Sequence, residues 1–303
     1  MKINILLLSF LLSFQVYAYC PSLSIVDVPS IVNLNNDLSP KETVRLYRGD
    51  TYSECDVYIG IDKGSSSTYN RKINSSVNSI PFSIATNNSM NRVWMDFRDA
   101  SSSQNYFSHK FKANKGSDYK KMNIYAELDL VGNEPPGVYS DSFFIKAYQR
   151  YGPWYLHSYS IPITYQYTIP SNVAISIVGS NQSFDPYDTS ENLNFNTLIQ
   201  GDAKNFDIVV QSNSGYILKA ESQNNGKLKH TQVNSTISYI FKANGGAVNL
   251  TNSSSNPQTI SSGVGAYPND GFRVPIQIEI GSINNKIAGN YSDQITITVT
   301  TNL

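Results

Sequence analysis

The chain has 303 residues, no net charge at pH 7 and only 15% charged residues, against roughly 25% in ordinary soluble proteins. A chain of this length usually folds into one or two domains. Without net positive charge, a nucleic acid is not expected as a partner. The polarity comes instead from Asn, Ser, Thr and Tyr, a composition that suits the outer faces of β-sheets in an exported protein.

The first residues have the features of a targeting segment. Lys2 is followed by an apolar run over residues 3–14, and Val16-Tyr17-Ala18 places small residues where a signal peptidase cleaves. The apolar run is too short to span a bilayer, and polar sequence follows it. We therefore expect residues 1–18 to be a secretory signal and the mature chain to be exported.

The two cysteines, Cys20 and Cys55, both lie near the start of the expected mature chain. Export to an oxidising compartment favours a disulfide between them. Closing a loop of this length would stabilise the fold by roughly 3–4 kcal/mol in the chain-entropy model. The alternative is a pair of free, buried thiols.

Most of the chain consists of short alternating runs separated by clusters of Gly, Asn, Ser and Pro. Helical periodicity is almost absent, and this combination is typical of β-sandwiches and barrels. The clearest predicted strands are residues 56–61, 122–130, 206–210, 274–280 and 294–299.

An internal repeat divides the chain in two. Gly-Val-Tyr-Ser-Asp at 137–141 returns as Gly-Asn-Tyr-Ser-Asp at 289–293, and the run at 80–82 has a counterpart at 237–239. Each copy of the motif follows one alternating run and precedes another. The repeat predicts two related β-sandwich domains, at residues 19–168 and 169–303. The Tyr and Asp of each motif are expected to have a structural role where the strand begins.

The two copies differ at their ends. After Ala147 the first copy turns and adds an extended run over residues 156–167, whereas only four residues follow Val299 in the second copy. We therefore expect the second domain to lack its last strand and to expose an apolar groove. Its walls would be the last and first strands of that domain, with Ile295, Ile297 and Val299 facing Val173, Ile175 and Ile177. The alternative is that these six are ordinary core residues of a sandwich that closes with fewer strands.

Several of these segments also resemble a known family. The Gly-x-Tyr-Ser-Asp motif before an alternating C-terminal strand, the segment at 55–64 (Cys-Asp-Val-Tyr-Ile-Gly-Ile-Asp-Lys-Gly), Leu193-Asn194-Phe195 and Ser212-Asn213 are similar to the spore coat protein U domain family. That family includes pilins of the archaic chaperone–usher pathway. The chain departs from its pattern at Asn196, where glycine is usual, and in the absence of cysteines from the second domain.

The resemblance implies incomplete immunoglobulin-like domains and three partners. A periplasmic chaperone lends a strand, an outer-membrane usher receives the complex, and the N-terminal extension of an adjacent pilin subunit then replaces the chaperone strand. Two tandem domains resemble tip adhesins, which attach cells to surfaces and support biofilms. If Cys20 is bonded to Cys55, the N-terminus is held in its own domain and cannot be donated, so the expected location is the tip of a surface pilus, or fimbrium.

Three segments of the first domain are candidates for contact with a host or abiotic surface, glycans included. Each combines aromatic or apolar residues with turn-forming ones, and exposed apolar loop tips usually have a binding use. The candidates are Val93, Trp94, Met95 and Phe97; Tyr106 and Phe107; and Tyr151, Pro153, Trp154 and Tyr155. For each segment the alternative is a place in the core.

Nothing in the sequence indicates catalysis. His109, His157 and His230 lie far apart and match no metal-binding spacing, and no nucleophile or phosphate-binding motif is present. We expect no enzymatic activity, metal or cofactor. The alternatives to a tip adhesin are a secreted carbohydrate-binding β-sandwich protein and a pilus subunit away from the tip.

Overall fold

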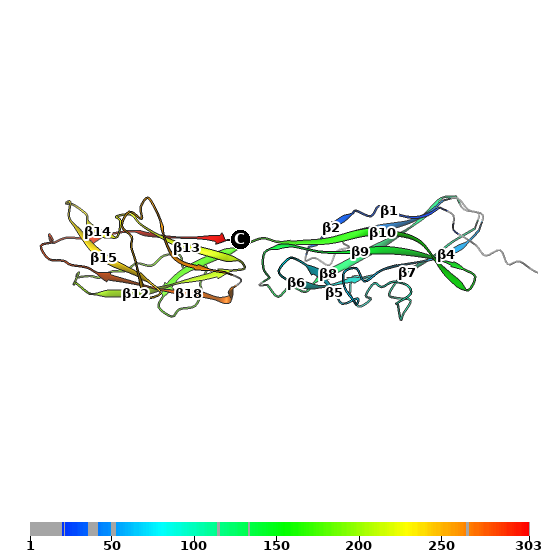
Figure 1. Ribbon diagram of the computed structural model, residues 1–303, viewed down its shortest axis with the longest axis horizontal. Helices are drawn as coiled ribbons and strands as arrows, with labels where there is room; N and C mark the ends of the chain where they lie inside the picture. Colours follow the sequence, from blue (N-terminus) through cyan, green and yellow to red (C-terminus); the bar gives the residue numbers. More distant parts are fainter. Residues whose placement is uncertain are drawn as a thin grey trace, which may run out of the picture. The chain divides into compact units, whose positions relative to one another are not determined.

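The computed structural model describes residues 20, 22–35, 42–49, 53–113, 116–132, 134–264 and 267–302. The expected signal segment lies outside these residues. All regular elements in the described part of the chain are β-strands (Figure 1). That part accordingly contains no helix long and apolar enough to cross a membrane. The chain divides into two compact units, the first ending at Tyr167 and the second containing Thr168–Leu303.

The first unit is built on one ten-stranded sheet. β8 pairs with β3 through its first half and with β6 through its second half. The strand order is β1-β3-β8-β6-β5-β9-β10-β2, and β4 pairs with both β7 and β9. The strands are β1 (Leu23–Val26), β2 (Ile31–Asn33), β3 (Glu42–Arg48), β4 (Cys55–Ile61), β5 (Arg71–Asn74), β6 (Ser79–Ala85), β7 (Phe107–Phe111), β8 (Asp118–Leu128), β9 (Gly137–Tyr151) and β10 (Trp154–Ile169).

Strand β10 seals the core of this unit. It lies between β9 and β2, and it runs parallel to β2, with Thr164 opposite Ile31. Alternate residues of β9 and β10 point into the core, because side chains alternate between the faces of a strand. Phe143, Ile145 and Ala147 of β9 are buried, together with Ile163 and Tyr165 of β10. The long β9–β10 pair and the neighbouring β2 are visible in Figure 1.

The second unit packs two sheets around one apolar core. The larger sheet has the order β11-β12-β18-β15-β14-β19, with β16 beside β15, and the smaller one has the order β17-β13-β20. The strands are β11 (Val173–Gly179), β12 (Ala203–Ser212), β13 (Gly215–Ser222), β14 (Lys227–His230), β15 (Thr236–Ala243), β16 (Gly246–Val248), β17 (Gln258–Gly263), β18 (Tyr267–Ile280), β19 (Tyr291–Ser292) and β20 (Ile295–Asn302). The predicted fold class, two tandem β-sandwich domains of which the second has no strand after β20 in the described residues, is confirmed.

The glycine of the repeated motif has nearly the same φ angle in both copies. Gly137 and Gly289 have φ angles of 152° and 151°, a region that side chains rarely adopt. A Cβ at position 289 would also overlap the His230 ring. Four residues further on, Asp141 and Asp293 each accept a hydrogen bond from a turn amide, from Ser65 after β4 and from Asn224 after β13 respectively. These aspartates have the structural role expected from the repeat.

Candidate functional site

Two of the edge strands of the second unit lie close to each other, one from each sheet. β11 is the first strand of the larger sheet and β20 is the last of the smaller one. The two strands contact each other across the gap between the sheets. Among the strands that the structure describes, none pairs with the outer edge of either. In the first unit, the corresponding gap between β9 and β2 is occupied by β10.

The six predicted groove residues lie on these two strands. Ile295, Ile297 and Val299 of β20 are half-buried and alternate with exposed threonines. Val173, Ile175 and Ile177 of β11 are also half-buried, and all six pack against the buried core cluster. Their counterparts on β9 (Phe143, Ile145 and Ala147) are fully covered. The same apolar pattern is therefore sealed in one unit and partly open in the other.

A segment between β11 and β12 covers one end of the gap. The amide of Ile177 donates a hydrogen bond to the carbonyl of Asp188 at 2.8 Å, and Leu193 and Phe195 pack against the core cluster. Nearer the start of β11, the described residues form no backbone hydrogen bond with the outer edge at Val173 or Ile175. The unpaired edge is thus the half of β11 that lies toward the last residues of β20.

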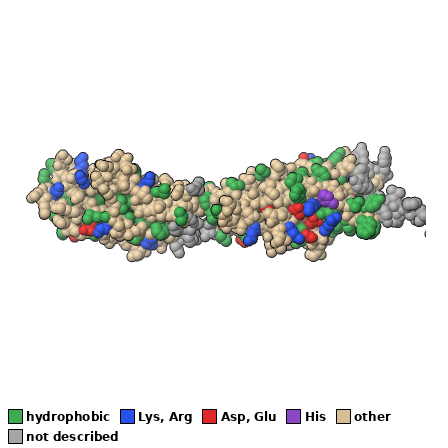
Figure 2. Space-filling model, viewed as in Figure 1, with side chains coloured by type: hydrophobic (Ala, Val, Ile, Leu, Met, Phe, Trp, Pro, Cys, Tyr) green, Lys and Arg blue, Asp and Glu red, His purple; other side chains and the backbone are tan. Residues whose placement is uncertain are grey.

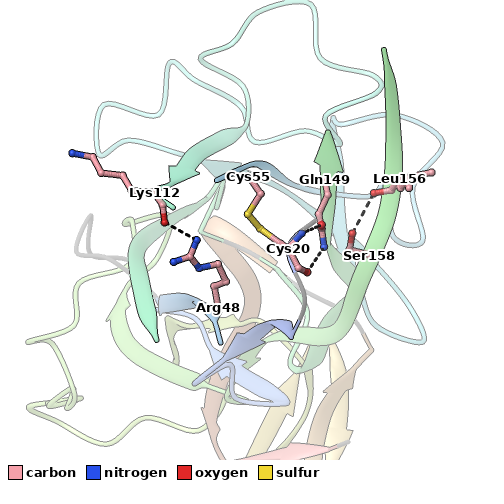
Figure 3. The surroundings of a disulfide bond; sticks show 7 residues. All are labelled: Cys20, Arg48, Cys55, Lys112, Gln149, Leu156 and Ser158. Atoms are coloured by element: carbon pink, nitrogen blue, oxygen red, sulfur yellow. Dashed lines mark hydrogen bonds between the residues drawn. A yellow bond between two sulfur atoms is a disulfide. The ribbon is translucent and has the colours of Figure 1, made fainter. Parts of the chain in front are cut away.

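The predicted disulfide between Cys20 and Cys55 is present and fixes the start of the described chain (Figure 3). Cys20 is buried. Its amide donates to Oε1 of Gln149 at 2.7 Å, and Nε2 of Gln149 donates to its carbonyl at 3.1 Å. Cys20 is thereby held to β4 by a covalent bond and to β9 by two hydrogen bonds. The alternative of free thiols is wrong.

The first candidate adhesive segment places one of its aromatic residues in the core. Trp94 is fully buried, donates from Nε1 to the carbonyl of Ile59 at 3.2 Å, and packs edge-on against Phe107. The expectation that Trp94 is an exposed contact residue is wrong. The segment lies so close to β4 that a Cβ at Gly60 would overlap the backbone of Met95. Val93, Met95 and Phe107 are half-buried.

Residues from all three candidate segments are brought near one another by a tyrosine that sequence reasoning did not select. Tyr58 on β4 stacks on Phe97 at 4.5 Å between ring centroids and meets Tyr106 and Tyr155 edge-on at 5.9 and 5.3 Å. Burial raises the pKa of Tyr58, so its ring stays uncharged near neutral pH. The sequence feature that could have identified Tyr58 is its outward-facing position in the alternating run at residues 56–61.

The third segment forms the turn of the β9–β10 hairpin. Trp154 is 70% exposed, and Tyr151, Pro153 and Tyr155 are also exposed. Leu156, which was not selected from the sequence, extends this apolar surface. We call Tyr151, Pro153, Trp154, Tyr155 and Leu156 the hairpin tip.

The described residues contain no group of three or more His, Cys, Asp or Glu side chains that could hold a metal ion. The three histidines are distributed over β7, β10 and β14.

Comparisons with known proteins give only loose structural likenesses. The chain matches no protein-family model and no curated protein, so the resemblance to the spore coat protein U family remains a hypothesis. Among solved structures, it is similar to a chain of the CsuC–CsuE chaperone–tip adhesion subunit pre-assembly complex from the archaic chaperone–usher Csu pili of Acinetobacter baumannii. The identity is 12% and the TM-score 0.41, over 89% of this chain and 96% of that one.

Two further likenesses are of the same kind. The CupB6 tip adhesin from Pseudomonas aeruginosa is 12% identical with a TM-score of 0.40, over 84% of this chain and 85% of that one. CfaE, the adhesive subunit of CFA/I fimbria of enterotoxigenic Escherichia coli, is 15% identical with a TM-score of 0.35, over 84% and 74%. These superpositions are loose, and the function proposed below rests on the geometry of the chain itself.

Proposed function

We propose that this chain is the tip subunit of a chaperone–usher pilus, whose second unit accepts a strand from another protein and whose first unit attaches to a surface. The observation that carries the proposal is the contrast between β9 and β20. The inward residues of β9 are buried under β10, whereas Ile295, Ile297 and Val299 are half-exposed on a strand with an open edge. An open edge beside an apolar groove is an aggregation hazard unless another chain covers it.

The first unit supplies a template for the incoming strand. β10 pairs with β9 on one side and runs parallel to β2 on the other. By the same arrangement, the incoming strand would run antiparallel to β20 and parallel to β11. Ladder hydrogen bonds to the two edges would supply affinity, and alternate apolar side chains in the groove would set the register. The strand would come first from a periplasmic chaperone and then, at an outer-membrane usher, from the adjacent pilin subunit.

The disulfide supports a place at the end of the fibre. Cys20 is buried, bonded to Cys55 and hydrogen-bonded to Gln149, so the chain at this point is not free to leave its own unit as a donated strand. A subunit that accepts a strand and donates none terminates a fibre. The proposed location is therefore the tip of a cell-surface fimbrium, with a role in attachment and biofilm formation and without catalysis.

The two faces of β20 provide a matched test. Ile297 points toward the groove, and the adjacent Thr298 is exposed on the opposite face. We expect Ile297→Asp to abolish co-purification of the chain with a chaperone or pilin subunit from the periplasm, because a carboxylate would be buried in an apolar groove. Thr298→Asp should leave co-purification unchanged.

Hydrogen exchange tests whether the edges of β11 and β20 are open until a partner strand binds. In the isolated wild-type chain, the outer-edge amides of β20 and of β11 near Val173 and Ile175 should exchange rapidly, and they should become protected in the purified complex. Protection of these amides in the isolated chain, or equal co-purification of both variants, would contradict the proposal.

A second candidate function is attachment through carbohydrate alone, without a pilus. It is favoured by the exposed hairpin tip and by the aromatic cluster around Tyr58, since exposed aromatic rings on a β-sandwich can stack on sugars. This candidate predicts that the isolated chain is monomeric and needs no partner strand, and the hydrogen-exchange measurement separates it from the first.

A further inference from the structure

An open cleft of about 470 Å³ lies on the outer face of the first unit, where β4, β9 and β10 meet the segment between β6 and β7. Its volume falls within the range of roughly 300–1,000 Å³ of small-molecule sites. The residues that line it are Asp62, Arg98, Phe144, Lys146, Tyr148, His157 and Ser160. Figure 2 shows acidic, basic and histidine side chains gathered on one face of this unit.

Most of the charges around the cleft are paired with each other. The ammonium of Lys146 lies 3.3 Å from Oδ2 of Asp62 and 3.8 Å from Oδ2 of Asp96. Just outside the cleft, Lys63 lies 3.1 Å from Asp99, and the pKa of Asp99 is lowered mainly by its hydrogen bond with Lys63. The carboxylates therefore already have cationic partners.

Arg98 is the exception. Its guanidinium stacks over the ring of Tyr148 at 4.8 Å, and Nη2 donates a hydrogen bond to the carbonyl of Tyr155 at 3.4 Å. Among the residues that the structure describes, no carboxylate forms an ion pair with it. The hydroxyl of Tyr148 donates to Asp96 at 2.8 Å. Burial, followed by this hydrogen bond, raises the pKa of Tyr148, so the tyrosine does not neutralise the arginine above it.

His157 and groups suited to contact with a sugar line the cleft together with Arg98. The His157 ring meets Tyr148 edge-on at 5.6 Å between ring centroids. Phe144 is 45% exposed at the cleft, and Ser160 contributes a hydroxyl. A guanidinium held on an aromatic ring presents a planar fork that matches a carboxylate or sulfate. An exposed aromatic ring and a hydroxyl can contact the apolar face and the hydroxyl groups of a sugar ring.

We propose that this cleft binds an acidic saccharide, with Arg98 receiving the anionic group and Phe144 contacting the sugar ring. The proposal deepens the attachment role proposed above and rests on it, since it names the class of ligand that the first unit would recognise. A saccharide is favoured over an acidic peptide because the cleft, at about 470 Å³, is small and combines one unpaired cation with an exposed aromatic ring. An extended basic surface would be needed for a polyanionic peptide.

Binding of the purified full chain, together with any subunit that co-purifies with it, tests the proposal by titration calorimetry. The acidic probes are sialyllactose and trigalacturonic acid, the neutral probe is lactose, and hexaglutamate represents an acidic peptide. At least one acidic sugar should bind measurably more tightly than lactose and hexaglutamate. The affinity should fall with added salt, because exposed charges are screened.

Arg98→Gln should weaken binding of the acidic sugar roughly tenfold or more, the cost of losing one charge-assisted contact. Arg98→Lys should give an intermediate affinity, because it retains the charge but not the fork. Arg150→Gln is the matched control: Arg150 is exposed on β9, bonds to the carbonyl of Gly152 and lies outside the cleft. The Arg150→Gln variant should bind the acidic sugar with the same affinity as the wild type.

Three results would overturn the inference. These are equal binding of acidic and neutral sugars, tighter binding of hexaglutamate, or an Arg98→Gln variant that binds as well as the Arg150→Gln control. Absence of binding to every probe would also count against it. The strand-accepting test reads the amides of β11 and β20 in the second unit, so its failure is distinguishable from a failure of saccharide binding in the first.

Discussion

Asp141 and Asp293 occupy the same position in the two repeats but interact with different partners. Asp141 forms a buried ion pair with Arg71, with hydrogen bonds of 2.9 Å from Nε and 2.6 Å from Nη2. Asp293 instead accepts hydrogen bonds from the hydroxyls of Ser222 and Tyr239, both at 2.6 Å. A single motif residue can therefore fasten the same turn with a charged partner or with neutral ones.

We predict that Asp141→Asn destabilises the first unit by about 3–5 kcal/mol, because it leaves the buried Arg71 guanidinium without a counter-charge. Asp27→Asn is the control. Asp27 pairs with Arg45 at 2.8 Å, but both side chains are about half exposed, and such pairs contribute about 0–1 kcal/mol. Both tryptophans lie in the first unit, so denaturant unfolding followed by tryptophan fluorescence measures the effect. Similar losses for the two variants would refute the assignment.

At the scale of elements, the segment between β6 and β7 illustrates how a loop can lie partly in the core. Its polar, turn-rich sequence predicts surface exposure. The glycine at position 60, however, lets the backbone of the segment lie directly on β4 and carry Trp94 into the core. The hairpin between β9 and β10 also combines aromatic and turn-forming residues, but its Trp154 is 70% exposed.

The two tryptophans should therefore respond in opposite ways to truncation. Trp94→Ala should cost about 3–5 kcal/mol of stability, the usual effect of emptying a large buried site. Trp154→Ala should change stability by no more than about 0.5 kcal/mol, while it should reduce attachment of cells to apolar surfaces if the hairpin tip makes that contact. Chemical denaturation and a surface-attachment assay measure the two effects. A large stability loss in Trp154→Ala would show that the tip is packed rather than exposed.

For the whole molecule, the two units depend on different devices for stability. The first has its own final strand and a disulfide that joins residues 35 positions apart. The second has neither a cysteine nor a strand beyond β20 in the described residues, and one edge of its core stays half-open. Stability of the first unit should therefore respond to redox conditions, and that of the second to a partner strand.

We predict that reduction of Cys20–Cys55 lowers the stability of the first unit by roughly 3–4 kcal/mol and leaves the second unchanged. Scanning calorimetry of the full chain with and without dithiothreitol should show one transition moving and the other remaining in place. Addition of a co-purifying pilin subunit should move only the second transition, because a ligand that binds the native state stabilises the unit that binds it. A single transition that shifts as a whole in both experiments would contradict this independence.

The sequence alone was sufficient to predict the main strands, the disulfide and the difference between the two copies. The alternation of apolar and polar residues in runs such as 294–299 depends only on adjacent residues. The recurrence of the 137–141 motif at 289–293 allows the two halves of the chain to be aligned and compared. Comparison of the two copies predicted an open edge in the second, and among the described strands none pairs with the outer edge of β20. The same alternation predicted the six apolar residues that we propose to line the groove.

Only the tertiary structure decided which aromatic residues are exposed and where the charges gather. Trp94 is buried because its loop packs directly on β4 at Gly60. The composition of the loop does not indicate this contact, because β4 is distant in the sequence. The cleft unites Asp62, Arg98, Lys146 and His157 from four separate parts of the first unit. Their proximity depends on strand order and on the path of the loop over the sheet, which are properties of the packed chain rather than of neighbouring residues.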